Sequence, residues 1–226
     1  MTELLTIDRI DETIAVLTLN RPDRRNALSI ALRDDISDAL ERLRADDDLQ
    51  VLVITGAGQT FSAGFDLNEF NQALEDQAFG DQLWASSDRY HHAVATFPLP
   101  VIAAVNGPAI AGGFDLAVLC DLRVVSTTTY FEHPERTFGD VVYGPLRELV
   151  GGANARDLIL TGRQVGAEDA VRLGLASTIV TPERIIPAAL ELARVVAKTP
   201  RAQLLRHKAK ILRFTGTADA QPTLEL

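Results

Sequence analysis

Cysteine and histidine are scarce in this sequence, which has one cysteine and four histidines among 226 residues. A single thiol, Cys120, excludes an intramolecular disulfide, and its spacing from the histidines matches no zinc-binding pattern. Long apolar runs are also missing, because no stretch reaches the roughly 18 apolar residues of a membrane-spanning helix. We therefore expect no disulfide, no metal site of the Cys/His kind and no membrane-spanning segment.

Basic residues are in the minority, with 22 Lys and Arg against 31 Asp and Glu and a net charge of -9. This charge repels polyanions at long range, so we expect neither nucleic acid nor an anionic membrane as a partner. A phosphorylated ligand would need a local basic cluster. The first residues are acidic where a secretory signal would be basic, which favours a cytoplasmic protein.

The composition is that of an ordered globular protein. Hydrophobic residues make up 46% of the chain and charged residues only 23%, which excludes disorder for most of it. The length suits one compact domain with a small appendage.

Local patterns predict a hairpin and a helix at the start of the chain. The β-rich residues 4–10 and 13–19 are separated by Asp11-Glu12, which is typical of two strands joined by a turn. Ser29 is a suitable N-cap for a surface helix. The apolar residues that follow it at helical spacing are Leu32, Ile36, Leu40 and Leu43.

Short apolar runs at 51–54, 101–105 and 122–125 predict buried strands. The first two lead through small residues into helices, the second of which covers about 112–120. Residues 132–144 are too rich in proline and glycine for long regular structure and predict a working loop. Beyond residue 153 the expected elements are helices over 156–160, 167–173, 182–197 and 201–214, a strand near 177–180 and a loose tail from Thr215.

Two segments of small residues stand where helices begin, directly after buried strands. They are Ser62-Ala63-Gly64-Phe65-Asp66 and Ala111-Gly112-Gly113-Phe114-Asp115. Small side chains let a ligand approach the main chain, and free N–H groups at a helix start can stabilise developing negative charge. Tight packing of strand against helix also needs glycine, so spacing alone leaves both explanations open. Two such segments in one short domain favour an anion hole.

Several short motifs occur in order along the chain. They are Asn20-Arg21-Pro22, Asn26-Ala27-Leu28, residues 61–67, Val105-Asn106-Gly107, residues 111–116, Cys120-Asp121, Thr161-Gly162-Arg163, residues 167–170 and Gly174-Leu175. The ordered set spans nearly the whole chain and resembles the crotonase (enoyl-CoA hydratase/isomerase) family. This resemblance implies an α/β fold with a spiral of ββα repeats over residues 1–185. It also implies a C-terminal helical trimerisation region and tail over 186–226.

The resemblance implies an acyl-CoA enzyme that forms a homotrimer or a dimer of trimers and needs no separate cofactor, because coenzyme A belongs to the substrate. The backbone N–H groups of Phe65 and Gly112 would form the oxyanion hole for a thioester enolate. Glu135 and Asp115 match the two glutamates of the family's hydratases. Asp115 departs from the pattern, because aspartate is one methylene shorter and its carboxylate would sit about 1 Å back, a misplacement that can cost about 10²-fold.

A third carboxylate, Asp140, lies in Phe138-Gly139-Asp140-Val141-Val142-Tyr143-Gly144, which resembles a stretch of the naphthoate-synthase branch of the family. The loop that contains it is shorter than in most relatives. Reversible hydration of a 2-enoyl-CoA is the expected activity. A double-bond isomerase, a hydrolase or lyase that uses Asp140, and a non-catalytic acyl-CoA binder are the alternatives.

The same resemblance assigns residues to coenzyme A. Arg24 and Arg25 are the best phosphate contacts of this acidic chain, and main-chain groups around Ala63, Asp66 and Leu67 would meet the adenine. Two further aromatic groups lie in the polar helical region that ends near Thr96. His91-His92 could contact the acyl chain, but we expect an exposed helical pair. We expect Trp84 to belong to the core or to the acyl pocket.

Overall fold

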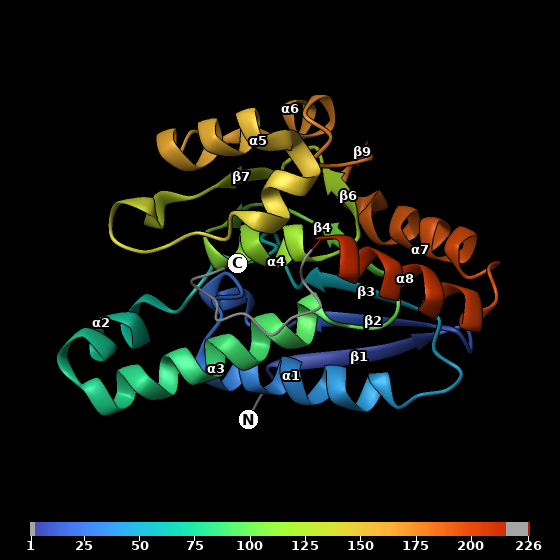
Figure 1. Ribbon diagram of the computed structural model, residues 1–226, viewed down its shortest axis with the longest axis horizontal. Coiled ribbons are helices and arrows are strands. Elements are labelled where there is room, and N and C mark those ends of the chain that lie inside the picture. The colour runs from blue at the N-terminus through green and yellow to red at the C-terminus, as the bar shows by residue number, and fades with distance from the viewer. Residues whose placement is uncertain (1–2, 216–225) are drawn as a thin grey trace.

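The computed structural model describes residues 3–215 and Leu226, and it combines two sheets with helices (Figure 1). The larger sheet has the order β1-β2-β3-β4-β6-β9. Its strands are β1 (Leu5–Ile10), β2 (Ile14–Leu19), β3 (Val51–Gly56), β4 (Val101–Val105), β6 (Leu122–Ser126) and β9 (Thr178–Val180). The smaller sheet has the order β5-β7-β8, with β5 (Ala109–Ile110), β7 (Tyr130–Glu132) and β8 (Val165–Gly166).

Helices surround both sheets, and in Figure 1 α2 reaches out on the side of the molecule opposite to α7 and α8. The α-helices are α1 (Ile30–Arg44), α2 (Leu67–Glu75), α3 (Gln77–Ala95), α4 (Gly112–Leu119), α5 (Gly144–Thr161), α6 (Ala167–Arg172), α7 (Ile185–Val196) and α8 (Arg201–Thr215). Three short 3-10 helices are η1 (Pro22–Arg24), η2 (Pro134–Thr137) and η3 (Pro182–Arg184). None of the helices in the described part of the chain is long and apolar enough to span a membrane.

The predicted hairpin and the buried strands are confirmed. Strands β1 and β2 pair antiparallel, whereas β2, β3, β4, β6 and β9 pair parallel in succession. Ser29 caps α1, because its Oγ accepts a hydrogen bond from the Leu32 amide at 3.3 Å. The sheet therefore begins with local pairing and continues through crossover connections that place helices against it.

Alternate side chains of the central strands enter different cores, as the two-residue period of a strand requires. Val51 and Val53 of β3 pack with α7, which buries Ile185, Ala189 and Ala193 on that face. The opposite face of the same strands packs in the core that includes α1, α3 and α4. The large sheet is thus covered on both sides.

The short second sheet makes the repeat visible. After β3 the chain passes through Ser62, which forms a β-bridge with Ala109 of β5. After β4 it forms β5, which pairs with β7. After β6 it forms β7, which pairs with β8. Each repeat therefore contributes one strand to the large sheet and one short segment to the small sheet, and a helix follows. This is the spiral of ββα repeats that the motifs implied.

The predicted loop over 132–144 contains more regular structure than expected. It begins with the end of β7 and includes η2, and α5 starts at Gly144, well before the helix expected after residue 153. Pro145 is compatible with this start because the first turn of a helix needs no N–H donor there. Gly151 interrupts α5 with a φ of 75°, which obscured the helical pattern. Of the predicted tail, residues 216–225 lie outside the described part.

A buried ion pair ties α8 to the core. Lys208 Nζ lies 2.6 Å from both carboxylate oxygens of Asp121, and the Lys208 side chain is 3% exposed. Asp121 also accepts the Val101 amide at 2.8 Å, at the start of β4. We expect Lys208→Met to lower the free energy of unfolding by about 3 kcal/mol, because it leaves a carboxylate unpaired. Urea denaturation checks this, and a loss near zero contradicts it.

Candidate active site

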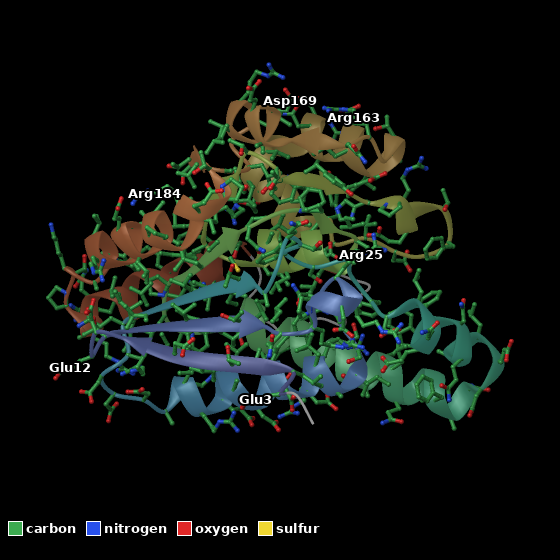
Figure 2. The ribbon with its side chains drawn as sticks, turned by 180° about the vertical axis from the view of Figure 1, so that it is seen from behind. Glu3, Glu12, Arg25, Arg163, Asp169 and Arg184 are labelled. Carbon is green, nitrogen blue, oxygen red and sulfur yellow. The ribbon has the colours of Figure 1, made fainter. Side chains whose placement is uncertain are left out.

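A cavity of about 320 Å³ lies between the segment after β3, the start of α4 and the loop after β7. Most of the predicted site residues line this cavity: Arg25, Ala63, Phe65, Leu67, Gly112, Asp115, Glu135 and Asp140. Arg24 and Asp66 do not line it. Figure 2 shows Arg25 next to the η1 turn, on the side of the molecule toward α2.

The backbone brings the Phe65 and Gly112 amides into one neighbourhood. A Cβ atom on Gly64 would lie 2.9 Å from the Gly112 nitrogen, and one on Gly112 would lie 3.0 Å from Cδ1 of Phe65. Across residues 3–215 and Leu226, neither of these two amides donates a hydrogen bond to another backbone group. Two donors are therefore available beside the cavity.

The conformation next to these amides is unusual. Ala111 has a φ of 51° and a ψ of -129°, which costs a non-glycine residue on the order of 1–3 kcal/mol. Its amide donates to Glu132 O of β7 at 2.9 Å, which holds this conformation in place. Gly64 has a φ of 81°, which favours glycine. The turns before Phe65 and Gly112 are thus fixed by the surrounding structure.

Asp115 and Glu135 reach the cavity from different elements. Asp115 lies in the first turn of α4 and is 6% exposed, and its Oδ1 has no hydrogen-bond partner within the described part of the chain. Glu135 lies in η2, and its Oε1 is bonded to the imidazole of His133 at 2.8 Å. Burial raises the pKa of Asp115 to about 7; the nearby His133 lowers it in part, and Glu135 raises it further. The site therefore holds one carboxyl group that titrates near neutral pH.

This raised pKa predicts a pH dependence of stability. The folded chain keeps the Asp115 proton up to a pH of about 7, whereas the unfolded chain loses it near 3.8. Stability due to this group is therefore present below pH about 4 and falls as the pH rises to about 7. Asp115→Asn lacks this proton and this pH dependence. The unfolding free energy of Asp115→Asn minus that of wild type should therefore rise by up to about 4 kcal/mol from pH 4 to pH 8. Urea denaturation across this range tests it, and a constant difference between the two proteins contradicts it.

The residues predicted to bind coenzyme A lie where two chain segments meet. The Ala63 amide donates to Arg25 O at 2.9 Å, so the two predicted ligand-binding segments are joined. The Asp66 side chain serves the fold, because it caps α2 through the Asn68 amide at 3.2 Å and pairs with Arg21 at 3.1 Å. Its main chain stays a predicted adenine contact, and Arg24 stays a predicted phosphate contact at the exposed end of η1.

The expectation of an exposed His91-His92 pair is wrong for His91. His91 is 1% exposed and lines the cavity, and its Nδ1 interacts with Ser87 O at 2.9 Å. Burial lowers its pKa to about 4, so the ring is neutral at pH 7. The buried face of α3 passes through Leu83, Ser87, Tyr90 and His91, and this helical spacing was the signal that the sequence offered. Trp84 is 37% exposed and so does not belong to the core, but it lines the same cavity.

Arg33 is a buried residue that the sequence did not reveal. Its guanidinium lies 4.3 Å from the centre of the Phe65 ring. It donates to Leu28 O at 2.9 Å, to Leu83 O at 3.2 Å and to Ser86 Oγ at 3.3 Å. Burial lowers its pKa to about 10, so it stays charged at pH 7. Arg33 therefore holds α1, α3 and the Phe65 ring together.

His133 was also missed as part of the site. It is 1% exposed and follows β7, two residues after buried Phe131, so that both side chains turn inward. This alternation was the available signal, but the sequence could not show that Glu135 would be its hydrogen-bond partner.

Comparisons with known proteins agree with this geometry. The family model for enoyl-CoA hydratase/isomerase matches residues 9–223. A curated relative from Thermus thermophilus, which carries a provisional enoyl-CoA hydratase name, is 39% identical over 209 residues that cover 90% of this chain and 82% of the relative.

Solved structures give the same result. The enoyl-CoA hydratase from Mycobacterium tuberculosis H37Rv is 35% identical with a TM-score of 0.81, over 96% of this chain and 89% of that one. An enoyl-CoA hydratase/isomerase from Xanthobacter autotrophicus Py2 is 28% identical with a TM-score of 0.89, over 100% of this chain and 84% of that one. The family model covers most of the chain, and the fold is shared at high similarity. This chain belongs to the enoyl-CoA hydratase/isomerase family.

Proposed function

We propose that this protein catalyses the reversible hydration of a 2-enoyl-CoA thioester. The observation that carries the proposal is one cavity lined by Phe65 and Gly112, whose amides are free to donate, and by the carboxyl groups of Asp115 and Glu135. Addition of water to the double bond places negative charge on the thioester oxygen. Two fixed N–H donors suit that charge, and the loss of one such donor typically costs about 10²–10³ in rate.

The two carboxyl groups suit the two parts of the reaction, which are the addition of a hydroxyl group at the β-carbon and of a proton at the α-carbon. Asp115 orients the water and accepts its proton as the oxygen bonds to the β-carbon. Glu135 enters this step with a proton and donates it to the α-carbon, which completes the 3-hydroxyacyl product. The proton that Asp115 took from water returns to Glu135 through solvent before the next turnover. A group with a pKa near the working pH is effective in proton transfer, and the pKa of about 7 for Asp115 fits this role.

The other residues that line the cavity are suited to bind an acyl chain and, next to it, a coenzyme A moiety. Apolar side chains form much of the wall: Leu67, Phe70, Trp84, Ile110, Phe138, Val141 and Val142. Arg25 supplies positive charge at the same cavity, where a phosphorylated group would need it. We expect no further cofactor, and we expect a homotrimer or a dimer of trimers in the cytoplasm, which light scattering and fractionation test.

A double-bond isomerase is the second candidate. The observation that favours it is the side chain of Asp115, which is one methylene shorter than the glutamate of the family's hydratases. Moving a double bond needs only one carboxylate to carry the proton, and Glu135 alone supplies that. Turnover of crotonyl-CoA and of 3-hexenoyl-CoA by the wild-type protein separates the two. Hydration of crotonyl-CoA is expected, and conversion of 3-hexenoyl-CoA without hydration of crotonyl-CoA supports the isomerase.

Two other candidates give different outcomes in the same assay. Asp140 lines the cavity, so a hydrolase or lyase remains an alternative in which Asp140→Asn abolishes turnover while Glu135→Gln does not. A non-catalytic binder takes up crotonyl-CoA in calorimetry and leaves it unchanged. Either result contradicts the proposed hydration.

A further inference from the structure

The imidazole of His133 lies behind the cavity wall. His133 does not line the cavity, but both of its titratable neighbours, Asp115 and Glu135, do. The side chain is 1% exposed. Any influence that it has on a bound substrate must therefore act through these neighbours.

His133 holds one of the two oxygens of Glu135. Its Nδ1 lies 2.8 Å from Glu135 Oε1, which is the distance of a charge-assisted hydrogen bond. Glu135 Oε2 is buried and has no hydrogen-bond partner in the described residues. One oxygen is thus anchored, and the other is left to exchange a proton.

The imidazole is itself held firmly. Its ring stacks on Phe114 with centroids 4.4 Å apart and an interplanar angle of 20°. Phe114 also contacts the Phe131 ring at 4.9 Å, which links the stack to β7. A ring that is packed on one side and bonded on the other cannot change rotamer without breaking contacts, so the carboxylate that it holds is fixed as well.

The charges around the ring support the same role. Burial alone would lower the pKa of His133, but the hydrogen bond to Glu135 and the nearby Asp115 and Glu135 carboxyl groups outweigh it and raise this pKa. The ring therefore lies near two acidic side chains and is hydrogen-bonded to one of them. His133 thus has favourable electrostatic interactions with both Asp115 and Glu135.

We propose that His133 is a positioning residue for the hydration proposed above, on which this inference rests. It donates from Nδ1 to Glu135 Oε1 and thereby fixes Oε2 as the oxygen that moves the proton at the acyl α-carbon. It acts through Glu135 and does not touch the substrate.

Four variants test this role. His133→Asn keeps an N–H donor near the place of Nδ1, whereas His133→Gln puts its amide near Nε2 and leaves Glu135 without the bond. His133→Leu removes every donor and keeps an apolar contact with Phe114. His92→Asn is the matched control, because His92 is exposed on α3 and has no part in the site.

Steady-state hydration of crotonyl-CoA gives the readout. We expect kcat to fall by about 10²-fold in His133→Leu and His133→Gln, with KM close to wild type, because a carboxylate displaced by about 1 Å loses that factor. His133→Asn should recover most of kcat, and His92→Asn should match wild type. Equal kcat values for His133→Asn and His133→Gln contradict the inference, even if His133→Leu does not fold.

The failure of this inference can be told apart from the failure of the proposed function. No hydration by the wild-type protein contradicts the proposed function and the inference together. Hydration by the wild-type protein with unchanged kcat in His133→Gln contradicts the role of His133 alone.

Discussion

Glu135→Gln should lower kcat for the hydration of crotonyl-CoA by about 10³–10⁴-fold, near the upper range for the loss of a group that transfers a proton. The amide keeps the size of the carboxyl group and can still accept a hydrogen bond from His133, but it can neither give nor take the proton at the α-carbon. KM should change little, because binding depends on the rest of the cavity. Steady-state kinetics with crotonyl-CoA measure both constants.

A matched control lies three residues earlier in the chain. Glu132→Gln changes the same functional group on β7, where its side chain is bonded to Gln164 at 2.9 Å and does not line the cavity. Its kcat should equal that of wild type. If Glu135→Gln and Glu132→Gln are equally active, Glu135 does not move the proton.

Gly64→Ala should reduce hydration by about 10²–10³-fold, the effect of losing one donor of an oxyanion hole. The new methyl group would stand 2.7 Å from Ala111 Cβ, 2.8 Å from Ile110 O and 2.9 Å from the Gly112 nitrogen. These atoms belong to backbone or to a short side chain, so the two segments must separate. The φ of 81° adds strain for any residue other than glycine.

Gly166→Ala is the control for this substitution. Gly166 has nothing within 4 Å of the added Cβ and no positive φ, so activity and stability should stay close to wild type. Kinetics should be measured on protein whose fold is checked by circular dichroism at the assay temperature. Activity of Gly64→Ala equal to that of Gly166→Ala contradicts the proposed arrangement of the two amides.

The parts of the fold that the sequence predicted are those with strong local signals. The hairpin of β1 and β2 and the cap at Ser29 depend on residues that are neighbours in the chain, so their patterns are visible without the structure. Strands β5 and β8 have only two residues each, too few for any period to appear. They form because their partners are brought to them by the larger sheet.

The candidate site divides in the same way. The two amides and the carboxyl groups stand in motifs, and the structure gathers their residues around one cavity. His133 and Arg33 carry no motif. The importance of His133 comes from its hydrogen bond to Glu135, two residues further along the same segment, and that of Arg33 comes from its contact with Phe65, which lies outside its own helix. A buried arginine is also contrary to the usual exposure of this residue type, so a sequence alone favours the opposite prediction.

The central claim is that the Phe65 and Gly112 amides stabilise charge on the thioester oxygen. A crystal structure with butyryl-CoA, the saturated counterpart of crotonyl-CoA, tests it most directly. We predict that the thioester oxygen lies within about 2.7–3.1 Å of both backbone nitrogens, with the α-carbon next to Glu135. A thioester oxygen bound away from either nitrogen contradicts the account.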